Sequence, residues 1–113
     1  MKASAAIDAL SALAQEHRLA LFRLLVQAGE QGMAAGAIAE ALEVPNSSLS
    51  FHLAQLSRAG LVTQERRHRS IVYRANYPAM NALVGYLMEN CCGGAGCGAV
   101  AVCESSVQER KSA

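Results

Sequence analysis

Residues 46–62 read NSSLSFHLAQLSRAGLV, and this stretch decides how the rest of the chain is interpreted. A capping asparagine at its start and a glycine near its end predict a helix over residues 47–59. Three leucines at positions i, i+4 and i+7 form one apolar stripe that should face a core: Leu49, Leu53 and Leu56. The remaining surface of this helix carries small polar side chains and one aromatic ring.

The flanking sequence places this helix in a larger pattern. Residues 34–42 predict a short helix that ends before Pro45, because the residue before a proline avoids the helical region. Residues 61–65 and 71–75 are rich in β-branched residues and flank a polar turn, which predicts a β-hairpin with arginines at its tip. Helix, tight turn, helix and hairpin in this order are typical of a winged helix-turn-helix, in which the hairpin is the wing.

Three more helices are predicted from apolar residues at helical spacing, over residues 4–15, 17–28 and 78–90. The first should bury Ile7, Leu10 and Leu13. The fold class is therefore mainly α with a small β-hairpin wing. A chain of 113 residues predicts one winged helix-turn-helix domain over residues 1–90, and two segments should follow it: a Cys/Gly-rich segment over 91–103 and a disordered tail over 104–113.

Composition excludes several classes of protein. The longest apolar run, residues 82–88, is too short to cross a bilayer, and the N-terminus lacks a signal-peptide pattern, so we expect a cytoplasmic protein without a membrane partner. The sequence shows no nucleophile–base pairing, no paired catalytic carboxylates and no phosphate-binding glycine loop. It therefore predicts neither an enzyme nor a catalytic cofactor.

Charge is unevenly distributed although the net charge is only +1. Residues 44–76 hold five arginines and one acidic residue, which favours a phosphate-bearing partner, although a solvated face explains the charge alone equally well. A helix that enters a major groove needs small or hydrogen-bonding side chains, and a basic hairpin can reach the backbone. The residues expected to contact double-stranded operator DNA are Asn46, Ser47, Ser48, Ser50, Phe51, His52, Gln55, Arg58, Arg66, Arg67 and Arg69.

The stretch quoted above, followed by the hairpin and by VYRA at residues 72–75, resembles the ArsR/SmtB family of metal-responsive repressors. The resemblance covers roughly residues 7–90. It implies a homodimeric winged helix-turn-helix repressor whose first and last helices form the dimer interface. The DNA-reading positions of the family fall on Asn46, Ser47, Ser50 and Phe51. Many members have histidine where Phe51 stands, so operator preference should differ here.

Four cysteines lie within residues 91–103, which begin with CCGGAGC. On a continuous helix Cys91 and Cys92 would point ~100° apart. The glycines that follow permit the chain to turn back and bring Cys97 over this pair. Three converging thiolates suit a soft ion, and trivalent arsenic or antimony binds three sulfurs in a pyramid without a fourth ligand.

Inducer sites known in other members of the family are absent, since residues 34–48 lack cysteine and residues 77–90 lack histidine. Some arsenic-sensing members carry a similar cysteine pair and a third cysteine after the last helix. The resemblance therefore implies an As(III) or Sb(III) inducer at Cys91, Cys92 and Cys97, whose binding releases the dimer from its operator. The alternatives are a Cd(II), Pb(II) or Zn(II) site that includes Cys103, a thiol-redox switch, or a segment without a ligand.

Overall fold

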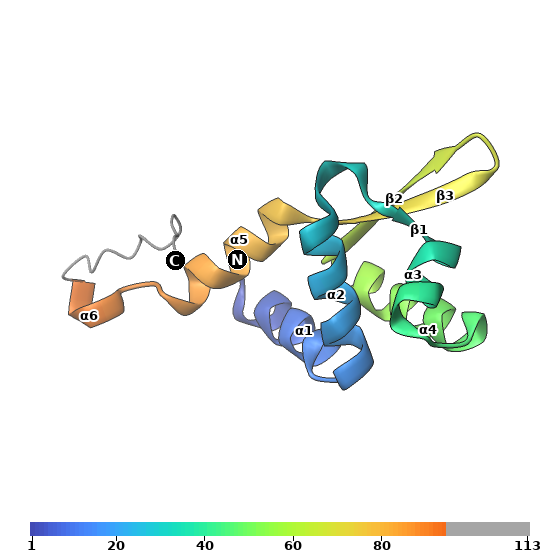
Figure 1. The fold of residues 1–113 in the computed structure, drawn as a ribbon. Coiled ribbons are helices and arrows are strands. Elements are labelled where there is room, and N and C mark those ends of the chain that lie inside the picture. The colour runs from blue at the N-terminus through green and yellow to red at the C-terminus, as the bar shows by residue number, and fades with distance from the viewer. Residues whose placement is uncertain (95–113) are drawn as a thin grey trace, which may run out of the picture. The chain divides into compact units, whose positions relative to one another are not determined.

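The computed structural model describes residues 1–94, and its ribbon is shown in Figure 1. The chain forms two compact units, Met1–Leu83 and Val84–Ala113, whose boundary lies inside the fifth helix. Within the described residues, no helix is long and apolar enough to span a membrane. The elements, in chain order, are α1 (Ala3–Leu13), α2 (Glu16–Ala28), the 3-10 turn η1 (Gly29–Gln31), β1 (Met33–Ala34), α3 (Ala35–Leu42), α4 (Asn46–Arg58), β2 (Val62–Arg67), β3 (Ser70–Ala75), α5 (Tyr77–Leu87) and α6 (Cys91–Gly94).

Helix α4 confirms the prediction made from the opening stretch, with one change at its start. Pro45 has extended backbone angles and occupies the cap position, and its carbonyl accepts a hydrogen bond from the amide of Leu49 at 3.0 Å. Asn46 is therefore the first helical residue and not the cap. The three leucines of the predicted stripe, Leu49, Leu53 and Leu56, are 1%, 4% and 0% exposed. They anchor α4 to the core and leave its opposite face to solvent.

Helix α1 buries a different face from the one predicted. Its core contacts come from Ala6, Ala9 and Ala12, whereas Ile7 and Leu10 are 61% and 42% exposed. Small alanine side chains permit close packing of α1 against α2 and α4. The larger apolar side chains are consequently left on the outside, so the expectation that the long side chains of this helix mark the core was wrong.

The junction between α1 and α2 also differs from the prediction, because α1 ends at Leu13. Gln15 is extended and caps α2, since its side-chain oxygen accepts a hydrogen bond from the amide of Arg18 at 3.0 Å. The Nε of Arg18 donates to the carbonyl of Ala12 at 2.7 Å. One arginine thus satisfies a carbonyl at the end of α1 from the first turn of α2.

The sheet has three strands in the order β1-β3-β2, all antiparallel. Met33 of β1, a strand that the sequence did not predict, pairs with Tyr73 of β3. Strands β2 and β3 are longer than predicted and leave only His68 and Arg69 between them, so Arg66 and Arg67 are strand residues and not turn residues. Figure 1 shows the resulting hairpin extending beyond the helices.

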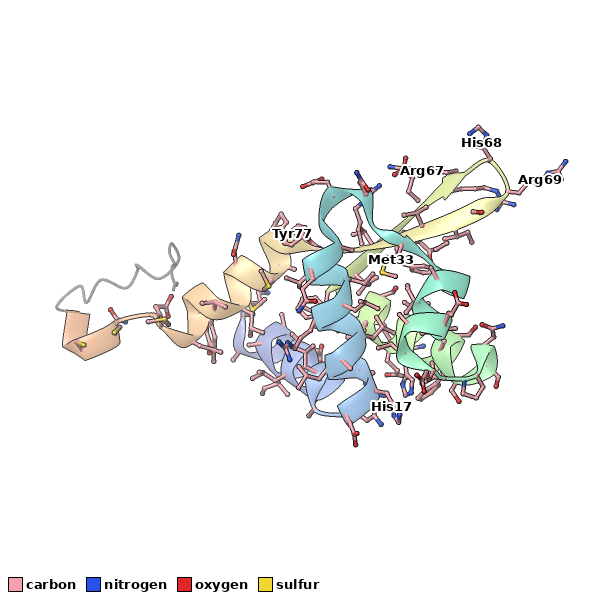
Figure 2. All side chains as sticks on the ribbon, in the orientation of Figure 1. His17, Met33, Arg67, His68, Arg69 and Tyr77 are labelled. Carbon is pink, nitrogen blue, oxygen red and sulfur yellow. The ribbon has the colours of Figure 1, made fainter. Side chains whose placement is uncertain are left out.

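Two close contacts tie the sheet to its neighbours. Gly32 has φ +67, and a Cβ at this position would lie 2.5 Å from the carbonyl oxygen of Tyr73. Only glycine permits both this backbone conformation and this approach. At the other end of the sheet, the hydroxyl of Tyr77 donates to the carbonyl of Val26 at 2.8 Å and fixes the start of α5 to the end of α2 (Figure 2).

Asn76 makes four hydrogen bonds at the junction between β3 and α5, one of them from the amide of Met80 to its carbonyl at 3.0 Å. Its amide nitrogen donates to the carbonyl of Leu61 and its Nδ2 to the carbonyl of Gly60, both at 2.8 Å. Its Oδ1 accepts from the amide of Ala79 at 3.3 Å, within the first turn of α5. One residue therefore connects the end of α4, the base of the hairpin and the start of α5.

Helix α5 ends at Leu87, three residues before the predicted end. Asn90 then adopts a left-handed conformation with φ 58, which a continuous helix cannot contain. The next four residues form a single turn, α6 (Cys91–Gly94), in which Cys92 and Gly93 are left-handed. Of the apolar residues on α5, Leu83 is buried, whereas Val84 and Leu87 are 48% and 58% exposed.

Candidate nucleic-acid interface

The exposed surface of α4 has an outer edge and two flanks. At ~100° per residue, the side chains opposite the buried leucines are those of Ser47, Phe51 and Arg58. All three are exposed, and Phe51 retains 56% of its accessible surface. Ser50 and Ser57 lie on the flank next to the hairpin. A large apolar ring at the outer edge of a polar helix is free to contact a thymine methyl in a major groove.

The hairpin, or wing (residues 62–75), presents two different faces. Its register pairs Val62 with Ala75, Gln64 with Tyr73, and Arg66 with Ile71, so these six side chains share one face. Buried Val62 and Ala75 lie at the base of this face, which is therefore the one next to α4. Arg66 belongs to it, nearer the tip. Arg67 lies on the opposite face, and Figure 2 shows it close to His68 and Arg69.

Two arginines of the wing form ion pairs with Glu65, and within residues 1–94 the other arginines of the wing do not. The Oε1 of Glu65 lies 2.6 Å from Arg74 and 3.5 Å from Arg67, on the face that points away from α4. The hydrogen bond from Arg74, followed by the charges of Arg67 and Arg74, lowers the pKa of the Glu65 carboxyl. Arg74 also donates from Nε to the carbonyl of Glu30 at 3.0 Å. Within residues 1–94 the arginines without an ion pair include Arg58, Arg66 and Arg69, so these three keep an unshared positive charge.

A pocket of about 350 Å³ lies between α4 and the wing. It is lined by Ser50, Leu53, Ala54, Ser57, Val62, Gln64 and Tyr73. Three polar residues of this lining, Ser57, Gln64 and Tyr73, were not among the predicted contacts. Alternation along the two strands could have placed Gln64 and Tyr73 on one face, but only the observed register shows that this face meets α4.

A second pocket, of about 360 Å³, lies on the other flank of α4, where α1 and α2 meet it. The predicted contacts Gln55 and Arg58 line this pocket together with Arg18 and Asp8. Two guanidinium groups and one carboxylate therefore share this space. Gln55 is turned toward the body of the protein and lies farther from the outer edge of α4 than Phe51 does.

His52 contacts α2, although it was predicted to lie on the DNA face. Its ring stacks on that of His17 with centroids 5.6 Å apart and planes inclined by 18°. Its Nδ1 is buried without a hydrogen-bond partner. Desolvation first, and then the charges of Arg18 and His17, lower the pKa of His52. The location of His17 at the start of α2 is visible in Figure 2.

The cysteine pair has a different geometry from that of two neighbours on one helix. The Sγ atoms of Cys91 and Cys92 lie 3.5 Å apart. They approach because Cys92 is left-handed, with φ 57 and ψ 37, and Gly93 continues in the same conformation. The sequence predicted that the glycines after the pair would turn the chain, and the left-handed turn begins one residue earlier, at Cys92. Cys97 and Cys103 lie outside the described residues, and within residues 1–94 no three His, Cys, Asp or Glu side chains are grouped as a metal site.

Comparison with known proteins agrees with this architecture. A helix-turn-helix domain family matches residues 13–65. The transcriptional activator HlyU of Vibrio cholerae is 30% identical over 82 residues, which make up 73% of each chain. The solved structure of its reduced form covers 79% of this chain and 90% of its own, with 28% identity and a TM-score of 0.61.

Two further solved structures are similar. An ArsR-like transcriptional regulator from Rhodococcus sp. RHA1 matches with 26% identity and a TM-score of 0.68, covering 74% of this chain and 76% of its own. The homodimeric winged helix-turn-helix DNA-binding domain of a possible ArsR-family regulator from Mycobacterium bovis matches with 29% identity and a TM-score of 0.61, over 77% and 81%. These relatives are transcription regulators and not enzymes. The chain belongs to the ArsR/SmtB family of winged helix-turn-helix transcriptional regulators.

Proposed function

We propose that this protein is a homodimeric, cytoplasmic repressor that binds operator DNA and is released when As(III) or Sb(III) binds Cys91, Cys92 and Cys97. The observation that carries the proposal is the 3.5 Å separation of the Sγ atoms of Cys91 and Cys92. With bonds of about 2.3 Å, the length of a zinc–sulfur bond, one ion would hold these two sulfurs at an angle of about 100°. Two sulfurs at this separation can serve as neighbouring ligands of one ion, in a three-thiolate pyramid as well as in a tetrahedron.

DNA binding is supported by the surface around α4 and the wing. Phe51 and Ser47 are exposed at the outer edge of α4, and Arg58, Arg66 and Arg69 form no ion pair within residues 1–94. In this proposal the polar side chains of α4 enter the major groove and the arginines contact the backbone. The remaining predicted contacts, Asn46, Ser48, Ser50, His52, Gln55 and Arg67, belong to the same proposal.

A homodimer is supported by apolar side chains that the single chain leaves uncovered. On α1, Ile7 and Leu10 are 61% and 42% exposed, and on α5, Val84 and Leu87 are 48% and 58% exposed. Side chains of this size are stabilised when a second surface removes them from water. The homodimeric relative from M. bovis supports the same assembly.

Operator release is tested by fluorescence anisotropy. A binding sequence is first selected from random duplexes with the thiol-reduced protein, and its affinity is then measured with arsenite, antimonite, Cd(II) or Zn(II). We expect arsenite and antimonite to weaken binding roughly 5- to 150-fold, the usual range of allosteric coupling. Unchanged affinity with arsenite and antimonite would contradict the proposed inducer and leave DNA binding intact.

Serine substitutions identify the ligands of the ion. Replacement of Cys91, Cys92 or Cys97 should abolish the response to arsenite while the affinity of the apo protein is retained. Cys103→Ser is the matched control, because a three-thiolate site does not use it. If this control also loses the response, or if Cd(II) alone acts, the site has four ligands and binds a tetrahedral metal ion.

A thiol-redox switch is the second candidate, and two observations favour it. The sulfurs of Cys91 and Cys92 are already close, and one solved structure of HlyU is of its reduced form. Oxidation would remove two electrons and two protons from a thiol pair, transfer them to a peroxide and form a disulfide. Operator release by peroxide but not by arsenite would favour this candidate. Because HlyU is an activator, a promoter assay determines whether release raises or lowers transcription.

A further inference from the structure

We propose that the pocket between α4 and the wing is a seat for one phosphate of the DNA backbone. The seat would be built from neutral hydrogen-bond donors: Ser50 and Ser57 of α4, and Gln64 and Tyr73 of the wing. This inference rests on the proposed binding of DNA and adds three residues, Ser57, Gln64 and Tyr73, to the interface. It assigns them a role different from that of the arginines.

The placement of the four donors follows from the geometry of the two elements. Gln64 and Tyr73 are direct cross-strand partners, so their side chains project from the same face of the wing. Ser50 and Ser57 are seven residues apart, two turns of one helix, and project from the same flank of α4. Ala54 lies between them and adds little bulk. The four side chains therefore surround one space of about 350 Å³.

None of these donors has a partner in the part of the chain that the structure describes. The side chains of Ser50, Ser57, Gln64 and Tyr73 make no hydrogen bond or ion pair within residues 1–94. Other polar residues nearby are satisfied, as Tyr77 is by Val26 and Asn76 is by Gly60. Around one pocket, four donors without a protein partner in residues 1–94 are available to an external acceptor.

The lining favours a phosphate and its sugar over other acceptors. No carboxylate lines this pocket, whereas the pocket on the other flank of α4 includes Asp8. Leu53 and Val62 complete the lining with apolar atoms and are each 4% exposed. Hydroxyl and amide side chains are common partners of phosphate oxygens, and Arg66 lies on the same face of the wing, next in line toward its tip.

The salt dependence of DNA binding distinguishes the loss of a neutral donor from the loss of a cation. A cation that contacts a phosphate releases counterions, so its loss flattens the plot of log affinity against log salt by about 0.9 for each contact. A hydroxyl that contacts a phosphate releases none. Loss of a neutral donor should therefore weaken binding by the same factor at every salt concentration.

The test uses Tyr73→Phe in the full chain, with Tyr77→Phe as the matched control. Affinity for the selected duplex is measured over a series of salt concentrations. We expect Tyr73→Phe to weaken binding about tenfold with an unchanged salt slope, because it removes a hydrogen bond to a charged group. Tyr77→Phe should bind as the wild type does, since its hydroxyl is bonded inside the protein. Thermal unfolding of both variants checks that each is folded.

A second measurement locates the seat on the DNA. Single phosphates of the duplex are replaced, one at a time, with uncharged methylphosphonates. One replacement should weaken the wild type more than it weakens Tyr73→Phe, because the variant has already lost one of the hydrogen bonds to that phosphate. If Tyr73→Phe binds the duplex as tightly as the wild type does, or if its salt slope falls by about one, the proposed phosphate site is wrong. Either result leaves the proposed binding of DNA unaffected. If the wild type selects no duplex, both the seat and the proposed function are wrong.

Discussion

The imidazole rings of His17 and His52 stack with their centroids 5.6 Å apart, which connects the first turn of α2 with the middle of α4. The contact lies one residue from Phe51, whose ring meets that of His52 edge-on at 5.7 Å. The charge on His52 is therefore linked to the packing of the helix that carries the predicted DNA-reading side chains.

This pair predicts that the protein loses stability as the pH falls below about 6.5. The folded state lowers the pKa of His52 below the ordinary value of 6.5, mainly by desolvation and then by the charges of Arg18 and His17. Above pH 6.5 the ring is neutral in both states, and the shift has no effect. Below it the unfolded chain takes up the proton first, so the free energy of unfolding decreases until the folded state is protonated as well.

Urea unfolding at pH 7.5 and pH 5.5 measures this loss. In His52→Gln, stability should differ less between the two pH values than it does in the wild type. His68→Asn is the control, because His68 lies at the exposed turn of the wing with φ 55, a conformation that asparagine tolerates. If His52→Gln keeps the full pH dependence, another group is responsible.

Gly32 and Gly29 predict different costs for the same substitution. Both have positive φ and ψ near −160°, a conformation that costs other residues about 1–3 kcal/mol. A Cβ at Gly32 would also lie 2.5 Å from the carbonyl oxygen of Tyr73, whereas a Cβ at Gly29 meets nothing within 4 Å. Gly32→Ala should therefore lower the free energy of unfolding by about 1–3 kcal/mol more than Gly29→Ala does. Equal losses in denaturant titrations would show that the sheet moves aside.

Tyr77→Phe should destabilise the protein slightly. The phenol hydroxyl donates to the carbonyl of Val26 at 2.8 Å and joins the start of α5 to the end of α2. Its removal leaves the ring in place and deletes one hydrogen bond, which contributes about 0.5–1.5 kcal/mol to stability. Thermal unfolding measures the loss. A variant as stable as the wild type would mean that water replaces the bond at no cost.

Arg66 and Arg67 are neighbours in sequence but should differ in DNA binding, if the proposed interface is correct. Arg66 lies on the face of the wing next to α4 without an ion pair in residues 1–94, whereas Arg67 lies 3.5 Å from Glu65 on the other face. Arg66→Ala should weaken binding and reduce the salt slope by about one. Arg67→Ala should change both less, because Glu65 already offsets part of its charge. The reverse order would place the DNA on the other face.

The sequence was sufficient to predict α4 and its buried leucines, because their helical spacing and their burial depend on the same periodicity. The hairpin was also predicted, although its strands are longer. Strand β1 was missed because two residues, Met33 and Ala34, carry no periodic pattern and form a strand only by pairing with β3. The buried face of α1 was predicted wrongly. Periodicity does not show whether the alanines or the larger apolar residues of a helix pack against its neighbours.

The sequence identified many residues of the candidate interface, but it did not show on which face of the wing each of them lies. Composition identified the arginines of the wing, yet the register decides that Arg66 faces α4 and Arg67 faces Glu65. Ser57, Gln64 and Tyr73 escaped prediction because their shared pocket forms only where two elements meet. The left-handed conformation of Cys92, which brings its sulfur to that of Cys91, could not be predicted either, since residues other than glycine rarely adopt it.

The hydrogen bonds of Asn76 have a mechanical consequence. Its side chain and its amide nitrogen hold Gly60 and Leu61, the two residues through which the chain passes from α4 into the wing. Its Oδ1 holds the first turn of α5. A displacement of the first turn of α5 is therefore transmitted through Asn76 to the loop from which the wing extends.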